Sequence, residues 1–456
     1  MRLAWFSPVP PVRTGIAACS ADLTAALGAR GYTVDLYPSE RAHDFPWRHR
    51  QDPYNLIVYQ FGNSSHHDYQ WAYALRYPGL VVLHDTHLHH ARAAFLLREQ
   101  RADHYRAEFR WSHPGVSADA AELAIAGFDS RLFYDWGMVR GLIESSRLVA
   151  VHGEATLREV MESTPRLRQG YGGQANSQTA NSQGDWRDRV VAIRLGHGQL
   201  VGAQDRQEAR ERIRVRYRIP ADAILFGVFG GLTPEKRIPQ VLRALRALVP
   251  YAPAARLLLA GAPAPHYDVA ADIAALGLDE RVTLTGYLDT DAELTGHLAA
   301  CDVSLNLRWP TAGETSGPWL RALAAGTATI ITDLVHLADV PSLDPRTWTE
   351  NTPLKPTESP KPVCVAIDIL DEDHSLRLAM RRLAADADLR AQLAHAGQAW
   401  WGREHSVEVM ADDYERVMKD AAARPDPGLT LPAHMRDTGG RKLQALLAPF
   451  GIESPI

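Results

Sequence analysis

Two successive series of apolar segments, each alternating with helical patterns, constrain the fold of this chain more than any other feature. The first series has strand-like runs at residues 3–6, 32–37, 55–60, 80–83 and 148–151, and the second at residues 224–229, 256–260, 281–285, 303–307 and 329–332. The runs are nearly continuously apolar, which is typical of parallel strands covered on both faces. The sequence therefore predicts an α/β fold with two Rossmann-like domains that face each other across a cleft.

The predicted domains are residues 1–197 and residues 198–422, with a C-terminal helical stretch closing the second domain. Residues 165–186 are polar and rich in glycine and contain the tetrapeptide ANSQ twice, so we expect a disordered insertion there. Residues 423–456 are punctuated by proline and glycine, which predicts a flexible tail. Its amphipathic segment 442–450 leaves peripheral contact with a membrane open as an alternative.

Composition excludes several classes of function. The net charge of −5 argues against a nucleic-acid-binding protein, because such proteins normally carry a basic surface. No stretch has the 18 or so uninterrupted apolar residues of a membrane span, and the N-terminus does not resemble a signal peptide. The three cysteines are scattered without metal-ligand spacing. We therefore expect a cytoplasmic enzyme without a structural metal.

Two segments that follow predicted strands have the residues of an anion site. Thr14 and Gly15 begin a helix after the first strand, where free N–H groups favour an anion and glycine permits close approach. Lys236, the first lysine in the chain, follows the strand at 224–229, and Thr233 with Pro234 predicts a helix start there. A cation in a first helical turn opposes the helix dipole, so an anion bound beside Lys236 would explain its position.

A third segment, Glu314 to Gly317, precedes a helix that we expect to begin at Gly317 and end at Gly326. Thr315, Ser316 and the adjacent backbone N–H groups suit a diphosphate. A carboxylate beside phosphate is repelled unless it faces hydroxyl groups, so Glu314 points to a sugar. Simple capping of the helix is the structural alternative for the same residues.

A fourth segment, VVLHDTHLHH at residues 81–90, places several metal-ligating side chains after a buried strand. The spacing lacks a clear i, i+4 histidine pair with a downstream carboxylate, so metal binding is the weaker interpretation. His84, at the end of the strand, is the best functional candidate here, and Asp85 is expected to orient it.

From Met1 to about Met418, apart from the insertion, the chain resembles glycosyltransferase family 4, whose members are retaining enzymes with the GT-B fold. GGLTPEK resembles the family's basic phosphate-binding motif, with Lys236 in the lysine position and Gly231 where arginine is usual. RWPTAGETSGPWLRALAAG resembles the family's Glu-x7-Glu signature as a variant with a PT-x-GETS form. Glu314 lies one residue from the position of the signature's first glutamate, and Arg321 occupies the position of the second.

The resemblance implies transfer of a sugar from a nucleoside-diphosphate sugar to a glycan, glycolipid or other hydroxyl acceptor, with retention and without a metal or other cofactor. It implies catalytic roles for His84, Glu314 and Lys236. The donor-binding residues that it implies are Gly15, Lys236, Arg237, Glu314, Thr315, Ser316 and Gly317. A location in the cytoplasm, with contact at the inner membrane face as an alternative, fits such an enzyme of polysaccharide biosynthesis. A non-catalytic subunit that binds sugar nucleotides and a metal-dependent hydrolase remain the alternatives.

Overall fold

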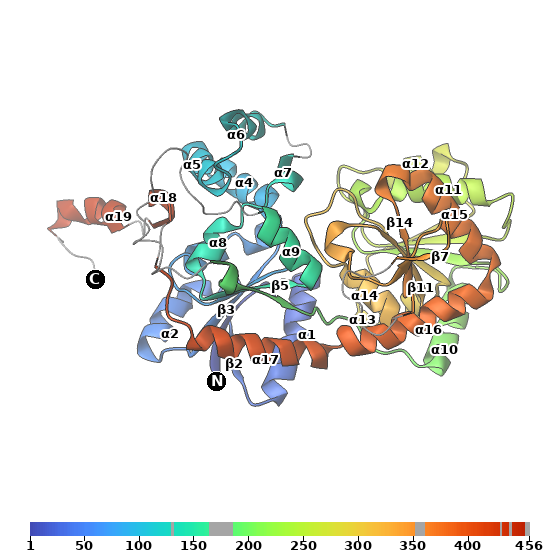
Figure 1. Ribbon diagram of the computed structural model, residues 1–456, viewed down its shortest axis with the longest axis horizontal. Helices are drawn as coiled ribbons and strands as arrows, with labels where there is room; N and C mark the ends of the chain where they lie inside the picture. Colours follow the sequence, from blue (N-terminus) through green and yellow to red (C-terminus); the bar gives the residue numbers. More distant parts are fainter. Residues whose placement is uncertain (129–131, 164–185, 352–360, 429–430, 437–439, 452–456) are drawn as a thin grey trace.

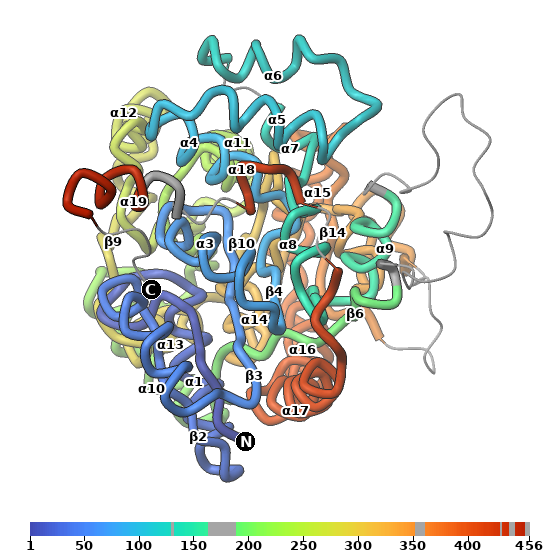
Figure 2. Tube along the Cα trace, turned by 90° about the vertical axis from the view of Figure 1, so that its left-hand side faces the viewer, coloured from blue at the N-terminus to red at the C-terminus, as the bar shows by residue number. Residues whose placement is uncertain are grey.

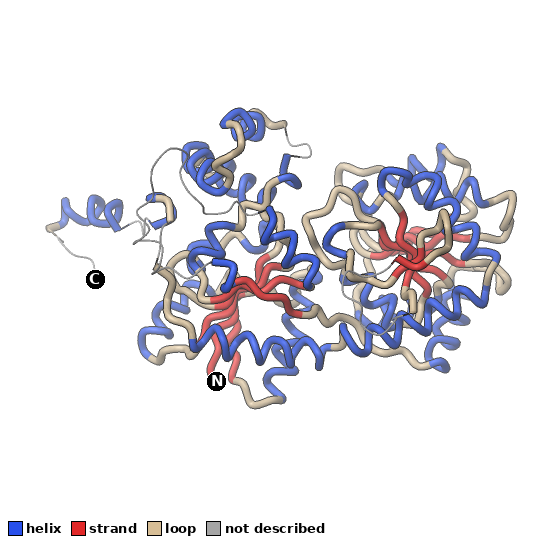
Figure 3. The backbone as a smooth tube through the Cα atoms, viewed as in Figure 1, coloured by secondary structure: helices blue, strands red, loops and turns tan. Residues whose placement is uncertain are grey.

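The computed structural model describes residues 1–128, 132–163, 186–351, 361–428, 431–436 and 440–451, and the predicted insertion at 165–186 lies almost entirely outside them. The chain forms two α/β domains, each built on its own sheet (Figures 1 and 3). All ten predicted strands are present, each shifted by no more than one residue at its ends. Their continuous apolar character reflects helices on both faces of each sheet.

The first sheet is wholly parallel in the order β2-β1-β3-β4-β5-β6. Its strands are β1 (Arg2–Phe6), β2 (Thr33–Leu36), β3 (Leu56–Phe61), β4 (Leu80–Leu83), β5 (Leu148–His152) and β6 (Val190–Ile193). Its helices are α1 (Gly15–Ala29), α2 (Phe45–Gln51), α3 (Gln70–Ala74), α4 (His89–Arg98), α5 (Ala102–Ser112), α6 (Ala118–Ile125), α7 (Leu132–Asp135), α8 (Arg140–Ser145) and α9 (Glu154–Ser163). Single 3-10 turns lie at Ala42–Asp44 (η1), Ser65–His67 (η2) and Trp186–Arg189 (η3).

Helices α4 to α7, which lie between β4 and β5, form a projecting block with its own small core (top of Figures 1 and 2). A buried ion pair joins α4 to α5 inside this block, with Arg92 Nε 2.8 Å from Glu108 Oε1. These helices were not predicted from the sequence.

The second sheet has the order β13-β12-β14-β11-β10-β7-β8-β9, parallel except for the β12–β13 pair. Its strands are β7 (Leu225–Phe229), β8 (Arg256–Ala260), β9 (Val282–Gly286), β10 (Val303–Asn306), β11 (Ala328–Thr332), β12 (Ser342–Leu343), β13 (Glu350–Asn351) and β14 (Cys364–Ile367). Its helices are α10 (Ala203–Arg216), α11 (Ile238–Leu248), α12 (Val269–Ala275), α13 (Asp291–Ala300), α14 (Gly317–Ala324), α15 (Glu372–Ala385) and α16 (Ala387–Glu404). Its 3-10 turns lie at Pro234–Lys236 (η4), Val335–Leu337 (η5) and Ile369–Asp371 (η6).

The C-terminal helices do not all belong to the second domain. α15 and α16 pack on the second sheet, as expected, but α17 (Val407–Ala423) crosses back and lies with α1 against the first sheet (Figure 1). The rings of Trp5 and Tyr414 stack at 5.8 Å in this contact. The expectation that the C-terminal helical stretch closes the second domain is therefore wrong for α17. Its apolar side chains Met410, Tyr414 and Val417 pack in the core of the first domain.

Residues after 423 form α18 (Ala433–Arg436), α19 (Gly440–Leu447) and a final 3-10 turn, Ala448–Phe450 (η7). Leu431 and Met435 are buried in the core of the first domain, so this part of the expected flexible tail is anchored. No helix within the described ranges is long and apolar enough to cross a membrane.

Polar contacts join the two domains on both sides of the interface. Arg13 pairs with Asp289 at 3.0 Å, and Arg158 of α9 donates to both carboxylate oxygens of Asp339 at 2.8 and 2.9 Å. Between them, the backbone N–H groups of residues 86 and 87 donate to Ala312 O at 2.9 and 3.0 Å. The loops after β4 and β10 thus touch across the interface.

Candidate active site

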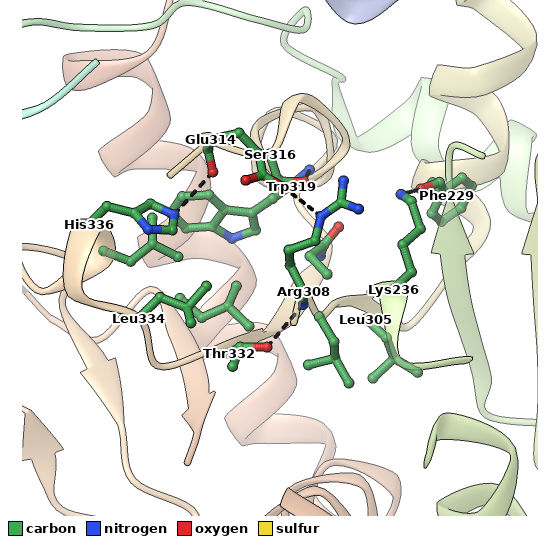
Figure 4. Close-up of a pocket in the computed structure, with 14 residues that line it drawn as sticks. Phe229, Lys236, Leu305, Arg308, Glu314, Ser316, Trp319, Thr332, Leu334 and His336 are labelled. Carbon is green, nitrogen blue, oxygen red and sulfur yellow. Dashed lines mark hydrogen bonds and ion pairs between the residues drawn. The ribbon is translucent and has the colours of Figure 1, made fainter. Parts of the chain in front are cut away.

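A small pocket lies at the carboxyl end of the second sheet, where a doubly wound fold binds its ligands (Figure 4). Its polar lining comes from the ends of several strands and from the loop before α14: Lys236, Asn306, Arg308, Glu314, Ser316, Thr332 and His336. The pocket measures about 30 Å³, which is room for about one water molecule. A ligand the size of a nucleotide sugar therefore requires the domains to separate or side chains to move before it enters.

Glu314 is the most highly connected residue of the pocket. Its Oε2 accepts hydrogen bonds from Thr311 Oγ1 and from Ala312 N, both at 2.8 Å, and its Oε1 lies 2.6 Å from Arg308 Nε. Its carbonyl oxygen is 3.1 Å from His336 Nε2. Burial alone would raise the pKa of Glu314, but Arg308 and these donors hold it below its usual value. The side chain is a fixed, ionised hydrogen-bond acceptor.

Lys236 lies opposite Glu314 and reaches the same pocket. It is the last residue of η4 and precedes Arg237, whose backbone is left-handed with φ 59°. The helix start that Thr233 and Pro234 predict is present, with Lys236 in its first turn, but it is a single 3-10 turn, and the longer helix α11 begins separately at Ile238. Lys236 Nζ donates to Phe229 O. Burial and then the nearby Arg308 lower the pKa of Lys236 to about 7, and Glu314 opposes this change.

The start of α14 has the geometry that the sequence indicated. Ser316 is the N-cap, its Oγ accepts a hydrogen bond from Trp319 N at 3.3 Å, and Gly317 is the first helical residue. A Cβ on Gly317 would lie 2.9 Å from His197 Cδ2, so packing alone already requires glycine at this position. Ser316 lines the pocket, whereas Thr315 is partly exposed and is not part of the lining.

Gly15 is the first residue of α1, with Thr14 Oγ1 accepting from Ala17 N at 3.1 Å. It is exposed, and a Cβ there would meet no atom within 4 Å. The protein's own packing therefore does not require glycine at this position. Close approach of a ligand to Gly15 stays a prediction.

Two arginines that the sequence motifs singled out, Arg237 and Arg321, are held away from the pocket. Arg237 forms a bidentate ion pair with Glu372 of α15, from Nε at 2.7 Å and from Nη2 at 2.5 Å. Arg237 does not line the pocket, and its guanidinium is used in fixing α15. Arg321 is 5% exposed, donates from Nε to His197 Nε2 at 3.0 Å and pairs with Asp291 at 3.1 Å. Each of the two guanidinium groups is thus held by side chains from distant parts of the chain.

His84 lies at the end of β4 in a buried hydrogen-bonded series. Its Nε2 is 2.7 Å from Gln60 Oε1, which also accepts from Tyr414 of α17 at 3.2 Å, and its Nδ1 is 3.2 Å from His152 Nε2. Burial, and then His152, hold the pKa of His84 well below its ordinary value, so the ring is neutral. The expectation that Asp85 orients His84 is wrong, because Gln60 and His152 occupy both ring nitrogens.

Asp85 instead faces the second domain. Its Oδ2 accepts from Asn63 N at 2.6 Å. Burial and the Glu314 carboxylate raise the pKa of Asp85 to about 7, while the Asn63 N–H and Arg308 act in the opposite direction. Burial and Glu314 also raise the pKa of Glu159 of α9. Carboxylates from both domains thus converge on the loop that carries Glu314, a cluster that sequence spacing could not reveal.

The histidines after β4 do not converge on a common point. His89 Nε2 is 2.7 Å from Tyr105 OH inside the helical block, and His87 Nδ1 is 3.3 Å from Thr86 Oγ1. Over the described ranges, no three histidine, cysteine or acidic side chains are placed to hold a metal ion together.

A second cavity, of about 400 Å³, lies on the first domain at the carboxyl ends of β1, β2 and β3. Its lining combines the carboxylates of Glu40 and Asp68, the ring of Phe95, and His66 and Arg98. Arg98 pairs with Asp68 at 3.1 Å. Carboxylates beside an aromatic face suit the hydroxyl groups and apolar faces of a sugar.

Comparison with solved structures assigns the architecture to the GT-B class. Sucrose-phosphate synthase from Thermosynechococcus elongatus has 16% identity and a TM-score of 0.59, with 92% of this chain and 98% of that chain covered. HepE from Anabaena, in complex with UDP and glucose, has 15% identity and a TM-score of 0.57, with 92% and 99% covered. The catalytic domain of starch synthase IV from Arabidopsis thaliana, bound to ADP and acarbose, has 13% identity and a TM-score of 0.59, with 93% and 99% covered.

Within this fold, residues 223–352 match the family described as Glycosyl transferases group 1. The matched segment begins before β7 and contains Lys236, Arg308 and Glu314, and so includes all the polar side chains of the pocket in Figure 4. No curated protein matches the chain.

Proposed function

We propose that this protein is a glycosyltransferase that moves a sugar from a nucleoside-diphosphate sugar to a hydroxyl group of a glycan or lipid-linked acceptor. The observation that carries the proposal is the convergence of Lys236, Arg308 and Glu314 at the carboxyl end of the second sheet, within the segment that matches the group 1 family. The solved structures of the same fold that contain UDP or ADP support a nucleotide donor.

In the proposed complex the diphosphate lies against Lys236 and the N-terminus of α14, where Ser316 and Gly317 begin the helix. Glu314 then faces the hydroxyl groups of the transferred sugar, since an ionised carboxylate accepts hydrogen bonds from hydroxyls and is repelled by phosphate. Gly15 offers open space at the start of α1 for the donor to approach.

The proposed reaction breaks the bond between the anomeric carbon and the leaving phosphate oxygen, and the electron pair leaves with the nucleoside diphosphate. The acceptor oxygen forms the new bond on the same face of the sugar, and its hydroxyl proton passes to the departing phosphate oxygen. Positive charge fixed beside that oxygen stabilises the transition state without a metal ion. Retention and metal independence are parts of this proposal.

The acceptor is proposed to bind on the first domain, in the 400 Å³ cavity that contains Glu40 and Phe95. That volume is of the size that holds a small ligand. His84 is proposed to lie near the reacting sugar, at the end of the next strand of the same sheet. Because both of its ring nitrogens are hydrogen-bonded in this structure, His84 acts there only if the contact with Gln60 or His152 is exchanged for one with the ligand.

A cytoplasmic location also stays a prediction, as does peripheral contact with a membrane. α19 lies apart from the body of the molecule (Figure 1), and three apolar side chains of this region, Leu443, Leu446 and Phe450, are 42, 62 and 78% exposed. Flotation of the full chain and of a Leu446→Asp variant with vesicles that contain anionic lipids tests this contact. Equal flotation of both proteins, or of neither, contradicts it.

Incubation with a panel of UDP-, GDP-, ADP- and dTDP-sugars and acceptor glycans, in the presence and absence of a chelator, tests the proposed function. We expect transfer from one donor class, unchanged by the chelator, and a product with the anomeric configuration of the donor. Lys236→Ala and Glu314→Ala should lose transfer while remaining folded, whereas Arg243→Ala, at an exposed ion pair of α11, should not. Donor binding without transfer or hydrolysis would indicate the non-catalytic sugar-nucleotide-binding subunit instead.

A further inference from the structure

We propose that Arg308 is the second cation that binds the donor diphosphate, in place of the arginine that is absent at position 231. This assignment rests on the proposed function and names a residue from a different strand for the phosphate site. The argument depends on the geometry around Gly231, on the pairing of β7 with β10, and on the donors that Arg308 leaves unused.

The first step is that the phosphate-binding segment lacks its own second cation. Gly231 is exposed, and a Cβ built on it would meet no atom within 4 Å. The neighbouring Arg237 is held by both oxygens of Glu372. Its removal from that pair would leave a carboxylate that is 9% exposed without its partner, which is strongly unfavourable. Arg237 is therefore not the replacement.

The second step is that the sheet places Arg308 beside Lys236. β10 pairs with β7 in parallel, so the residues that follow the two strands emerge at the same edge. Two backbone contacts fix the position: Arg308 N donates to Thr332 Oγ1 at 3.1 Å, and Trp309 N donates to Glu235 O at 2.8 Å. The second contact joins the Arg308 segment directly to the turn that carries Lys236.

The third step concerns the direction of the guanidinium. Figure 4 shows it between Glu314 and Lys236, with Nε toward Glu314. Within the described part of the chain, Glu314 is the only ion-pair partner that Arg308 has, and the side chain is 36% exposed. A guanidinium has five N–H donors in a planar fork that fits phosphate, so the two Nη groups are left for a ligand. Glu314 thereby acts as the positioning residue for Arg308.

The fourth step is electrostatic. Two like charges at one site repel each other, and Arg308 is, after burial, the main cause of the low pKa of Lys236. Glu314 offsets only part of this repulsion, since one carboxylate faces two cations. A diphosphate carrying two negative charges would neutralise the remaining positive charge and hydrogen-bond both side chains.

Calorimetric binding of UDP, ADP and GDP, each compared with its parent nucleoside, tests the assignment on the full chain. We expect Arg308→Ala and Arg308→Gln to weaken binding of the recognised diphosphate by about 10- to 100-fold, as for loss of charge-assisted hydrogen bonds, with no change for the nucleoside. Arg243→Ala is the matched control, because it removes an exposed arginine from the same domain.

The decisive variant adds Gly231→Arg to Arg308→Ala. Because position 231 has open space around it and no left-handed backbone, it accepts an arginine, and diphosphate affinity should recover. Equal affinity of wild type and Arg308→Ala for the diphosphate would overturn the assignment, as would failure of the double variant to recover. A wild-type protein that binds the nucleosides but gains nothing from the diphosphate would refute the phosphate site itself, and with it the proposed function.

Discussion

Binding of the donor should weaken as pH rises above neutrality, because Lys236 must be protonated to hold the diphosphate. Burial and Arg308 lower the pKa of Lys236 to about 7 in the free protein, from an ordinary value of 10.5. A bound diphosphate stabilises the charged form, so the pKa of Lys236 rises in the complex and binding takes up a proton. The lysine therefore makes affinity highest below about pH 7 and lower above it.

The expected magnitude follows from the fraction of Lys236 that is protonated. With a pKa of about 7, roughly nine-tenths of the side chain is charged at about pH 6 and roughly 3% at about pH 8.5. If only the charged form binds, affinity falls by about 30-fold across this range, which is about 2 kcal/mol.

Calorimetry with an intact nucleotide sugar measures this dependence cleanly, because its two phosphates are both esterified and do not titrate in the range. Lys236→Arg should bind with little dependence on pH, since arginine stays charged throughout. Asp85 loses its proton in the same range and adds a negative charge near the site, so the series is repeated in Asp85→Asn. A flat profile in the wild type, or an equally steep one in Lys236→Arg, would refute the reasoning.

Two further predictions concern stability. The pKa of Asp85, about 7 in the folded protein against 3.8 ordinarily, means that the folded state loses stability progressively as pH rises from about 4 to about 7, and that the full loss persists above about pH 7. Asp85→Asn should therefore raise the free energy of unfolding, by at most roughly 4 kcal/mol at about pH 8 and by little at about pH 4. Denaturation of both proteins at the two pH values measures this difference. A variant that is less stable than the wild type at about pH 8 contradicts the prediction. Glu108→Gln should cost about 3–5 kcal/mol, because it leaves Arg92 buried without its charged partner. Replacing both Arg92 and Glu108 by apolar residues should recover most of that loss. If the double variant instead loses as much stability as the two single variants together, the two side chains do not stabilise each other as a buried pair.

Local sequence patterns were sufficient for most of the architecture. Buried strands such as β4, β7 and β8 are short apolar runs of the kind that a parallel sheet covered on both faces requires. The start of α14 is set by Ser316 as the N-cap and Pro318 in the first turn. The same kind of local information placed Lys236 and Glu314 after strand ends, at the edge of the sheet where ligands bind. Periodicity did not show that α17 crosses to the first domain, because an amphipathic helix does not specify which sheet its apolar face covers.

The sequence determined that the chain has two α/β domains, and that a cation and a carboxylate follow the strands of the second one. Only the tertiary structure decided which charges meet. Arg237, adjacent to Lys236 in sequence, is bound to Glu372 more than 130 residues away, while Arg308 reaches Lys236 because β10 lies beside β7. Pairing of strands and of ions is set by contacts between distant segments, which the order of residues along the chain does not contain.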